Sequence, residues 1–241
     1  MSHSIQIGRT TIPYTIRVSD KARKIKLVVR PDAVEVVSPQ GTTVEAVEQF
    51  VHTKRQWLFK SIQDLKRQQV TEWTQHYGSG AKIQYRGRYL MIRWHLEDTN
   101  EVSIQYSSKF EVTVPKNLSK YEQLKAVQAA FDTYLKHRAL VVSKQMARRY
   151  ERLLQVQSKN LIINQSKHNW GTCGKDNIIR INWQLIQAPT IAMQYVVAHE
   201  VTHLIHRNHS DEFWNTLGTA LTNWQEGKQS LESWERAHLR V

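Results

Sequence analysis

The chain is 241 residues long, enough for one large domain or two small ones with a sizeable core. Its single cysteine, Cys173, excludes an internal disulfide, and no run of about 18 consecutive apolar residues is present that could span a membrane. The N-terminal segment also lacks the apolar run of a signal peptide, so we expect a soluble, cytoplasmic protein.

The formal net charge of +13 is unevenly distributed along the chain. Residues 1–160 hold 27 Lys and Arg against 14 Asp and Glu, giving +13, whereas residues 161–241 hold seven of each. This excess indicates either an anion-attracting surface for nucleic acid or nucleotide phosphate on the N-terminal part, or a generic basic surface in contact with water only. The sequence favours the two interpretations equally.

The first 40 residues alternate apolar and polar side chains between Pro and Gly punctuation, which predicts a small antiparallel sheet. Thr43 is expected to cap a helix whose apolar positions continue to Leu65. The next segments predict three strand regions and a basic helix, namely 82–94, 102–106, 110–114 and Ser119 to about Leu154.

The last third of the chain contains two short apolar runs, 161–163 and 178–182, which predict strands on either side of a turn-rich loop, 169–174. Thr190 is a candidate N-cap for an apolar segment of helical length. We therefore predict an α+β fold with an N-terminal antiparallel β-rich lobe, residues 1–118, and a C-terminal core, residues 119–241.

Residues 199–209 read His-Glu-Val-Thr-His-Leu-Ile-His-Arg-Asn-His. His199 and His203 are four residues apart, so on a helix they share a face and can both reach one metal ion at about 2.0–2.1 Å. Glu200 lies beside such an ion, where it can take a proton from an activated water. The pattern indicates a zinc hydrolase. The competing interpretation is a core helix whose histidines only satisfy hydrogen bonds.

A catalytic zinc site needs three protein ligands and one open position. On a continuous helix His206 lies roughly 10 Å along the axis from His199, too far to close around the same ion. His209 can return to the metal if the helix ends near residues 207–208, where Asn208 tolerates a left-handed backbone. The spacing of the three histidines also matches the metzincin pattern. We predict His209 as the third ligand; the alternatives are two downstream carboxylates, Glu212 and Glu232.

Several motifs together resemble the YgjP-like metal-dependent hydrolases. They are Trp170-Gly-Thr-Cys173, Ile181-Asn182-Trp-Gln-Leu-Ile186, Tyr195-Val-Val-Ala-His-Glu200 and Asn208-His209-Ser210, with Lys21-Ala-Arg23 and Lys54-Arg55-Gln56-Trp57 in the N-terminal part. The resemblance implies a zincin-like core, related to SprT-like peptidases, with a His-Glu-x-x-His active-site helix. It also implies a Zn²⁺ ion on His199, His203 and His209, with Glu200 as catalytic base.

The leading functional hypothesis is a zinc-dependent metallopeptidase that acts on a peptide or protein substrate. Residues 178–182 are either a strand that pairs with that substrate or an interior strand of the core. The alternative is a metal-dependent nucleoside triphosphate pyrophosphohydrolase that uses the same site, with phosphates held by the basic N-terminal part. A nucleic-acid-binding module with structural zinc is disfavoured, because such sites are closed by four ligands and usually contain several cysteines.

Overall fold

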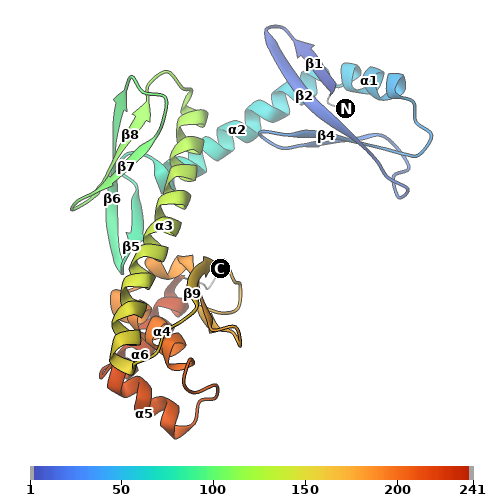
Figure 1. The fold of residues 1–241 in the computed structure, drawn as a ribbon. Coiled ribbons are helices and arrows are strands. Elements are labelled where there is room, and N and C mark those ends of the chain that lie inside the picture. Colours follow the sequence, from blue (N-terminus) through green and yellow to red (C-terminus); the bar gives the residue numbers. More distant parts are fainter. Residues whose placement is uncertain (1–2, 239–241) are drawn as a thin grey trace. The chain divides into compact units, whose positions relative to one another are not determined.

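The computed structural model describes residues 3–238 and divides into two compact units (Figure 1). Unit 1 comprises Met1–Gln75 with Ser119–Tyr121, and unit 2 comprises His76–Leu118 with Glu122–Val241. This division differs from the predicted border at residue 118, because the strands before that border share a core with the helix after it. In the described part of the chain, no helix has the length and apolar character needed to cross a membrane.

Unit 1 contains a four-stranded sheet with the order β1-β2-β4-β3. The strands are β1 (His3–Ile7), β2 (Thr10–Val18), β3 (Lys26–Val29) and β4 (Val34–Ser38). β2 and β4 run parallel, so the prediction of an antiparallel sheet was wrong for this pair. Alternation of apolar side chains marks the buried face of a strand but does not identify its neighbour.

Two helices follow this sheet, α1 (Val44–Thr53) and α2 (Arg55–Tyr77). The Thr43 side chain accepts a hydrogen bond from the backbone of Ala46 at 3.3 Å, which confirms the predicted N-cap. The single helix expected here is interrupted at Lys54, the C-cap of α1. Apolar side chains of both helices and of the sheet form the core of unit 1: Ile12, Tyr14, Val34, Val36, Val47, Val51, Leu58 and Ile62.

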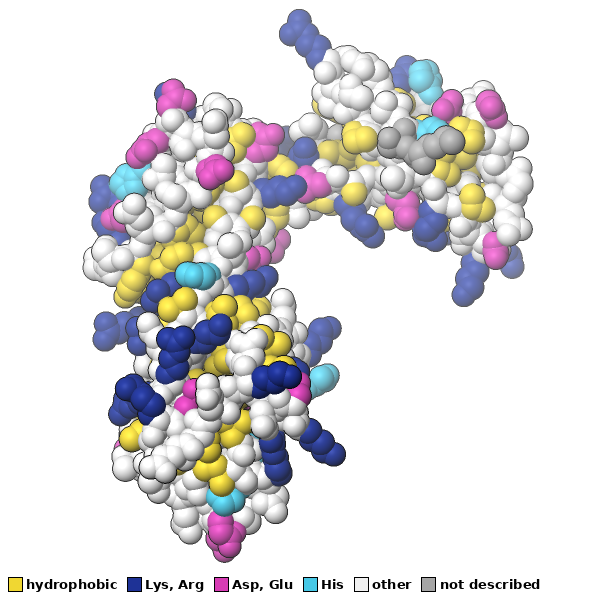
Figure 2. Space-filling view, in the orientation of Figure 1, with side chains coloured by type: hydrophobic (Ala, Val, Ile, Leu, Met, Phe, Trp, Pro, Cys, Tyr) yellow, Lys and Arg dark blue, Asp and Glu magenta, His cyan; other side chains and the backbone are white. Residues whose placement is uncertain are grey.

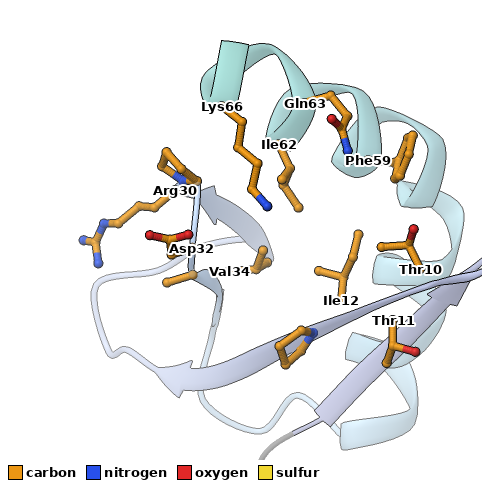
Figure 3. A pocket seen from close by; sticks show the side chains of 13 residues that line it. Thr10, Thr11, Ile12, Arg30, Asp32, Val34, Phe59, Ile62, Gln63 and Lys66 are labelled. Carbon is orange, nitrogen blue, oxygen red and sulfur yellow. The ribbon is translucent and has the colours of Figure 1, made fainter. Parts of the chain in front are cut away.

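A cavity of about 230 Å³ lies between β2, the turn before β4 and α2 (Figure 3). Lys66, one of the residues that line it, places its ammonium group 5.0 Å from the ring centre of Tyr121. The Tyr121 hydroxyl donates a hydrogen bond to Asp32 at 2.9 Å, and burial together with this carboxylate raises the pKa of Tyr121. Lys66 and Asp32 therefore already have partners within unit 1.

Many basic residues of the N-terminal part are exposed, among them Lys21, Arg23, Lys24 and Lys26 around the loop before β3. On the face seen in Figure 2, Lys and Arg side chains are spread over the surface and interspersed with acidic ones. Nucleic-acid binding by this part of the chain stays a prediction.

Unit 2 begins with a second sheet, ordered β5-β6-β8-β7. Its strands are β5 (Lys82–Tyr85), β6 (Arg88–Glu97), β7 (Ser103–Tyr106) and β8 (Phe110–Pro115). They pack on α3 (Lys120–Leu154), whose bounds agree with the predicted basic helix. Phe110 of β8 meets Phe131 of α3 edge to face, with ring centres 5.3 Å apart.

The C-terminal part of unit 2 contains a three-stranded sheet and further helices. The elements are β9 (Asn160–Asn164), β10 (Gly171–Cys173), β11 (Ile178–Asn182), η1 (Trp183–Ile186), α4 (Thr190–Thr202), α5 (Asp211–Ala220) and α6 (Trp224–His238). The two predicted strands are confirmed, but the expected loop 169–174 contains β10. Because the sheet order is β10-β11-β9, β11 is paired on both sides and cannot accept a peptide as another strand.

The turn between β5 and β6 anchors the segment that leads into α4. Arg86 and Gly87 have positive φ values of 52° and 78°, and their backbone N–H groups donate to the carbonyls of Ile186 and Gln187 at 2.8 and 3.0 Å. A Cβ on Gly87 would lie 2.8 Å from the Cα of Pro189, the N-cap residue of α4. Glycine at this position therefore allows the turn to touch the start of α4.

We expect Gly87→Ala to destabilise unit 2 by about 1–3 kcal/mol more than Gly80→Ala, measured by urea denaturation. Gly80 is a matched control, since its φ of +92° imposes a similar backbone strain but its Cβ would meet nothing within 4 Å. Equal losses at the two positions would show that contact with Pro189 does not constrain the turn.

Candidate metal centre and cleft

The helix α4 is apolar over most of its surface and ends at Thr202, with His203 as its C-cap. The chain then turns through hydrogen bonds from the N–H groups of Leu204 and Ile205 to the carbonyls of Val201 and Thr202, each 3.0 Å long. The helix therefore ends earlier than the predicted exit near residues 207–208. Among the described non-glycine residues, positive φ occurs only at Arg86, Gln155 and Asn177, so Asn208 is not left-handed.

Three imidazoles converge at the C-terminal end of α4. His199 Nε2 lies 3.2 Å from His203 Nε2 and 3.0 Å from His209 Nε2. One candidate ligand atom from each histidine lies within 4.8 Å of the others. Two nitrogens bound to one tetrahedral zinc at about 2.0–2.1 Å are roughly 3.3–3.4 Å apart. This donor set therefore suits a single divalent ion such as zinc.

The hydrogen bonds of His203 determine which of its nitrogens can face an ion. Its Nδ1 lies 2.9 Å from the carbonyl oxygen of His206, and a carbonyl can only accept, so Nδ1 carries the proton. Burial lowers the pKa of His203 and also lowers that of His199, to about 3, with the neighbouring histidines adding to the latter shift. Both rings are neutral at pH 7, and the Nε2 lone pair of His203 faces the centre.

Two aromatic side chains in the first turn of α5 pack against the imidazoles. Phe213 is fully buried, with its ring centre 4.7–4.8 Å from those of His199, His203 and His209. Trp214 stacks on His209 with ring centres 5.7 Å apart. These contacts restrict the rotation of the rings, which keeps the nitrogen atoms convergent.

The other sequence candidates lie elsewhere. His206 Nε2 is 2.9 Å from the hydroxyl of Thr216, so this nitrogen already has a hydrogen-bond partner. Glu212 is exposed in the first turn of α5, and Glu232 is exposed on α6. Within the described residues, the one group of His, Cys, Asp or Glu found close enough to hold an ion is His199, His203 and His209.

Glu200 lies beside this cluster and lines a cleft of about 210 Å³ together with His199, Tyr195 and residues 168–171. Its side chain is only 5% exposed, and burial raises its pKa to about 8. The backbone of β10 passes directly over it: a Cβ on Gly171 would lie 2.7 Å from Cγ and Oε1 of Glu200. A glycine within a strand indicates such a close approach, but the contact between Gly171 and Glu200 was not predicted from the sequence.

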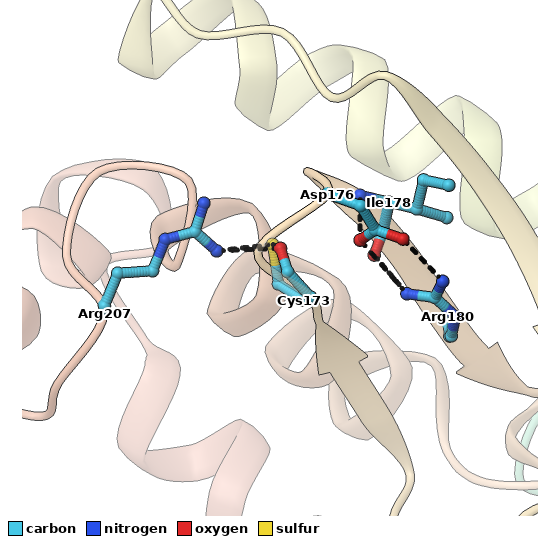
Figure 4. A network of polar contacts seen from close by, with 6 residues as sticks. Cys173, Asp176, Ile178, Arg180 and Arg207 are labelled. Carbon is cyan, nitrogen blue, oxygen red and sulfur yellow. Dashed lines mark hydrogen bonds and ion pairs between the residues drawn. The ribbon is translucent and has the colours of Figure 1, made fainter.

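Arg207 joins the turn after α4 to the hairpin of β10 and β11 (Figure 4). One guanidinium nitrogen donates to the Gly174 carbonyl at 3.0 Å and lies 3.6 Å from Cys173 Sγ, and the other donates to Asn177. Burial raises the pKa of Cys173, which keeps the thiol protonated and favours a packing role. No short-range pattern predicts the role of Arg207, because its partners are 30–34 residues away.

Three convergent histidines beside a buried carboxylate define a class of site that occurs in metal-dependent hydrolases. Comparison with known families identifies the chain more closely: the family model described as YgjP-like, metallopeptidase domain, matches residues 23–234. The chain therefore belongs to the YgjP-like metallopeptidase family, and this membership supports a metal-dependent peptidase in general.

A solved structure, that of the metallopeptidase zymogen of Pyrococcus abyssi abylysin, is similar to part of the chain. It shares 18% sequence identity at a TM-score of 0.36, over 41% of this chain and 96% of that one. Comparison with curated proteins finds no match.

We expect Glu200→Gln to stabilise the metal-free protein increasingly as the pH rises from about 4.5 to 8. The folded-state pKa of Glu200, about 8, exceeds the ordinary value of 4.5, so the parent loses stability over this interval while the unfolded chain ionises. Glutamine does not ionise, and the difference should grow by up to about 1.4 kcal/mol per pH unit. Urea unfolding with a chelator at pH 5 and pH 7.5 measures it.

Glu212→Gln is the control with the opposite sign. A hydrogen bond from Ser210 lowers the pKa of Glu212, so its carboxylate contributes stability above the ordinary pKa, and the substitution should weaken the protein at pH 7.5. If Glu200→Gln had the same effect at both pH values, burial would not be holding this carboxyl group neutral.

Proposed function

We propose that the chain is a zinc metallopeptidase, in which His199, His203 and His209 hold the ion and Glu200 is the general base. The observation that carries the proposal is the convergence of three imidazole nitrogens beside a buried carboxylate that lines a cleft. Three protein ligands are typical of catalytic zinc, whereas structural sites have four.

A zinc ion in this position supplies the Lewis acidity that activates water and polarises a peptide carbonyl. Glu200 accepts a proton from the attacking water and passes it to the nitrogen of the departing amine. A carboxyl group with a pKa of about 8 is a poor base at pH 7, but a cation held nearby lowers that pKa by favouring the charged form. Binding of the ion and activation of the base are thus coupled.

The surroundings of Glu200 favour a peptide over a nucleotide. The edge strand β10 passes over this residue and offers main-chain groups to an extended peptide, the role that the sequence had suggested for residues 178–182. The described residues that line the cleft include no Lys or Arg, the side chains that usually bind phosphate. Hydrolysis of a nucleoside triphosphate is therefore the weaker hypothesis.

We expect Glu200→Gln to retain zinc and to lose peptide hydrolysis by about 10²–10⁴-fold, because glutamine keeps the shape but cannot accept the proton. Product analysis of the zinc-loaded parent and variant, with peptides and nucleoside triphosphates offered in parallel, measures this loss. Zinc content by atomic absorption is the control for metal binding. Peptide hydrolysis by the variant at the parental rate would refute the role of Glu200, and hydrolysis of triphosphates alone would favour the pyrophosphohydrolase.

We also expect His209→Ala to lose zinc at neutral pH, whereas His206→Ala retains it. His209 Nε2 is 3.0 Å from His199 Nε2, while His206 faces Thr216. Metal content after dialysis of the two variants distinguishes them. Retention of zinc by His209→Ala at the parental affinity would exclude it as a ligand.

A further inference from the structure

A second cavity, of about 340 Å³, adjoins the cleft that contains Glu200. It is lined by residues 165–170 together with Asn182, Gln184 and Glu235. Three of its residues, His168, Asn169 and Trp170, also line the cleft. The cavity and the cleft therefore adjoin each other along these three residues.

The wall between the two cavities is fixed by hydrogen bonds to Asn182, which is only 3% exposed. The Asn182 side chain donates to the Ser166 carbonyl at 2.8 Å, and its backbone N–H donates to the Trp170 carbonyl at 2.8 Å. The Ser166 hydroxyl accepts from the backbone N–H groups of His168 and Asn169, each at 3.2 Å. The loop that contains residues 166–170 is thus hydrogen-bonded to β11 at both of its ends. These bonds restrict the shape of the cavity in the absence of a ligand.

The polar groups of this cavity suit a cation. Glu235 is half-buried, and its Oε1 accepts a hydrogen bond from the indole of Trp170. Within the described residues, Oε2 has no hydrogen-bond partner and Glu235 forms no ion pair, although the exposed Lys167 also lines the cavity. A half-buried carboxylate attracts a cation more strongly than an exposed lysine repels it, because water screens the lysine better.

Trp170 adds an aromatic ring to the lining of the cavity. Guanidinium groups stack on aromatic faces and bind carboxylates through two parallel hydrogen bonds, whereas an ammonium group does neither as well. Glu235 and the amide groups of Asn169 and Gln184 offer acceptors around such a group. The cavity volume lies at the small end of ligand pockets, roughly 300–1,000 Å³, which suits a single side chain.

We propose that this cavity is a specificity subsite for a basic side chain of the peptide substrate, preferentially arginine, with Glu235 as its anionic partner. The inference rests on the proposed peptidase function. It adds that the enzyme cleaves peptide bonds close to an arginine.

The test uses one peptide scaffold in which arginine is placed at successive positions and replaced, position by position, with citrulline. Citrulline matches arginine in shape but lacks its charge. With the zinc-loaded parent, we expect kcat/KM to be about tenfold or more higher for arginine at one position. Glu235→Gln can still accept the Trp170 hydrogen bond, so it should bring that ratio close to one.

Glu226→Gln is the matched control, because Glu226 is exposed on the same helix and the change in charge is the same. The arginine-to-citrulline ratio should be unchanged in this variant. A parental ratio of one at every position, or a ratio that survives Glu235→Gln, would overturn the subsite while leaving the peptidase function intact.

A binding experiment separates failure of the subsite from failure of the peptidase function. Titration calorimetry of the zinc-loaded Glu200→Gln variant with the arginine and citrulline peptides should show tighter binding of the arginine peptide, and adding Glu235→Gln should remove the difference. If the parent cleaved no peptide, the proposed function would fail, and this titration would still decide the subsite: equal affinities would overturn it.

Discussion

The organisation of unit 2 depends on the burial of polar groups at one end of an otherwise apolar helix. His199 and Glu200 are placed there by α4, and desolvation shifts their pKa values in opposite directions, to about 3 and about 8. Both groups are thereby held neutral in the absence of an ion. Burying them opposes folding, and the apolar side chains of the same helix, among them Val197, Ala198 and Val201, offset that cost.

The two ends of α4 are fixed by different parts of unit 2. At its start, the turn containing Gly87 touches Pro189 and binds the carbonyls of the preceding segment. Beyond its end, Arg207 connects the next turn to the β10–β11 hairpin, and Phe213 packs against all three imidazoles. The convergence of the nitrogen atoms therefore depends on residues that are widely separated in the sequence.

Local signals in the sequence predicted the elements that depend on nearby residues. The cap at Thr43, the bounds of α3 and the shared face of His199 and His203 all follow from short-range spacing. The parallel pairing of β2 with β4 and the contacts of Arg207 could not be predicted, because they are set by partners distant in the chain. The predicted end of α4 near residues 207–208 was also wrong, because the helix ends at Thr202 in a turn that needs no left-handed residue.

Two glutamate side chains beside the cleft, Glu200 and Glu235, have the same chemical group in different surroundings. Glu200 is almost fully buried under the backbone of Gly171, whereas Glu235 is half-buried and holds the Trp170 indole. The described residues that line the Glu200 cleft include no Lys or Arg, and the cation on the wall of the second cavity, Lys167, is exposed to water. In the proposed peptidase, the metal ion would supply positive charge beside Glu200, and a basic side chain of the substrate would supply it beside Glu235. A site arranged in this way favours ligands that bring cations.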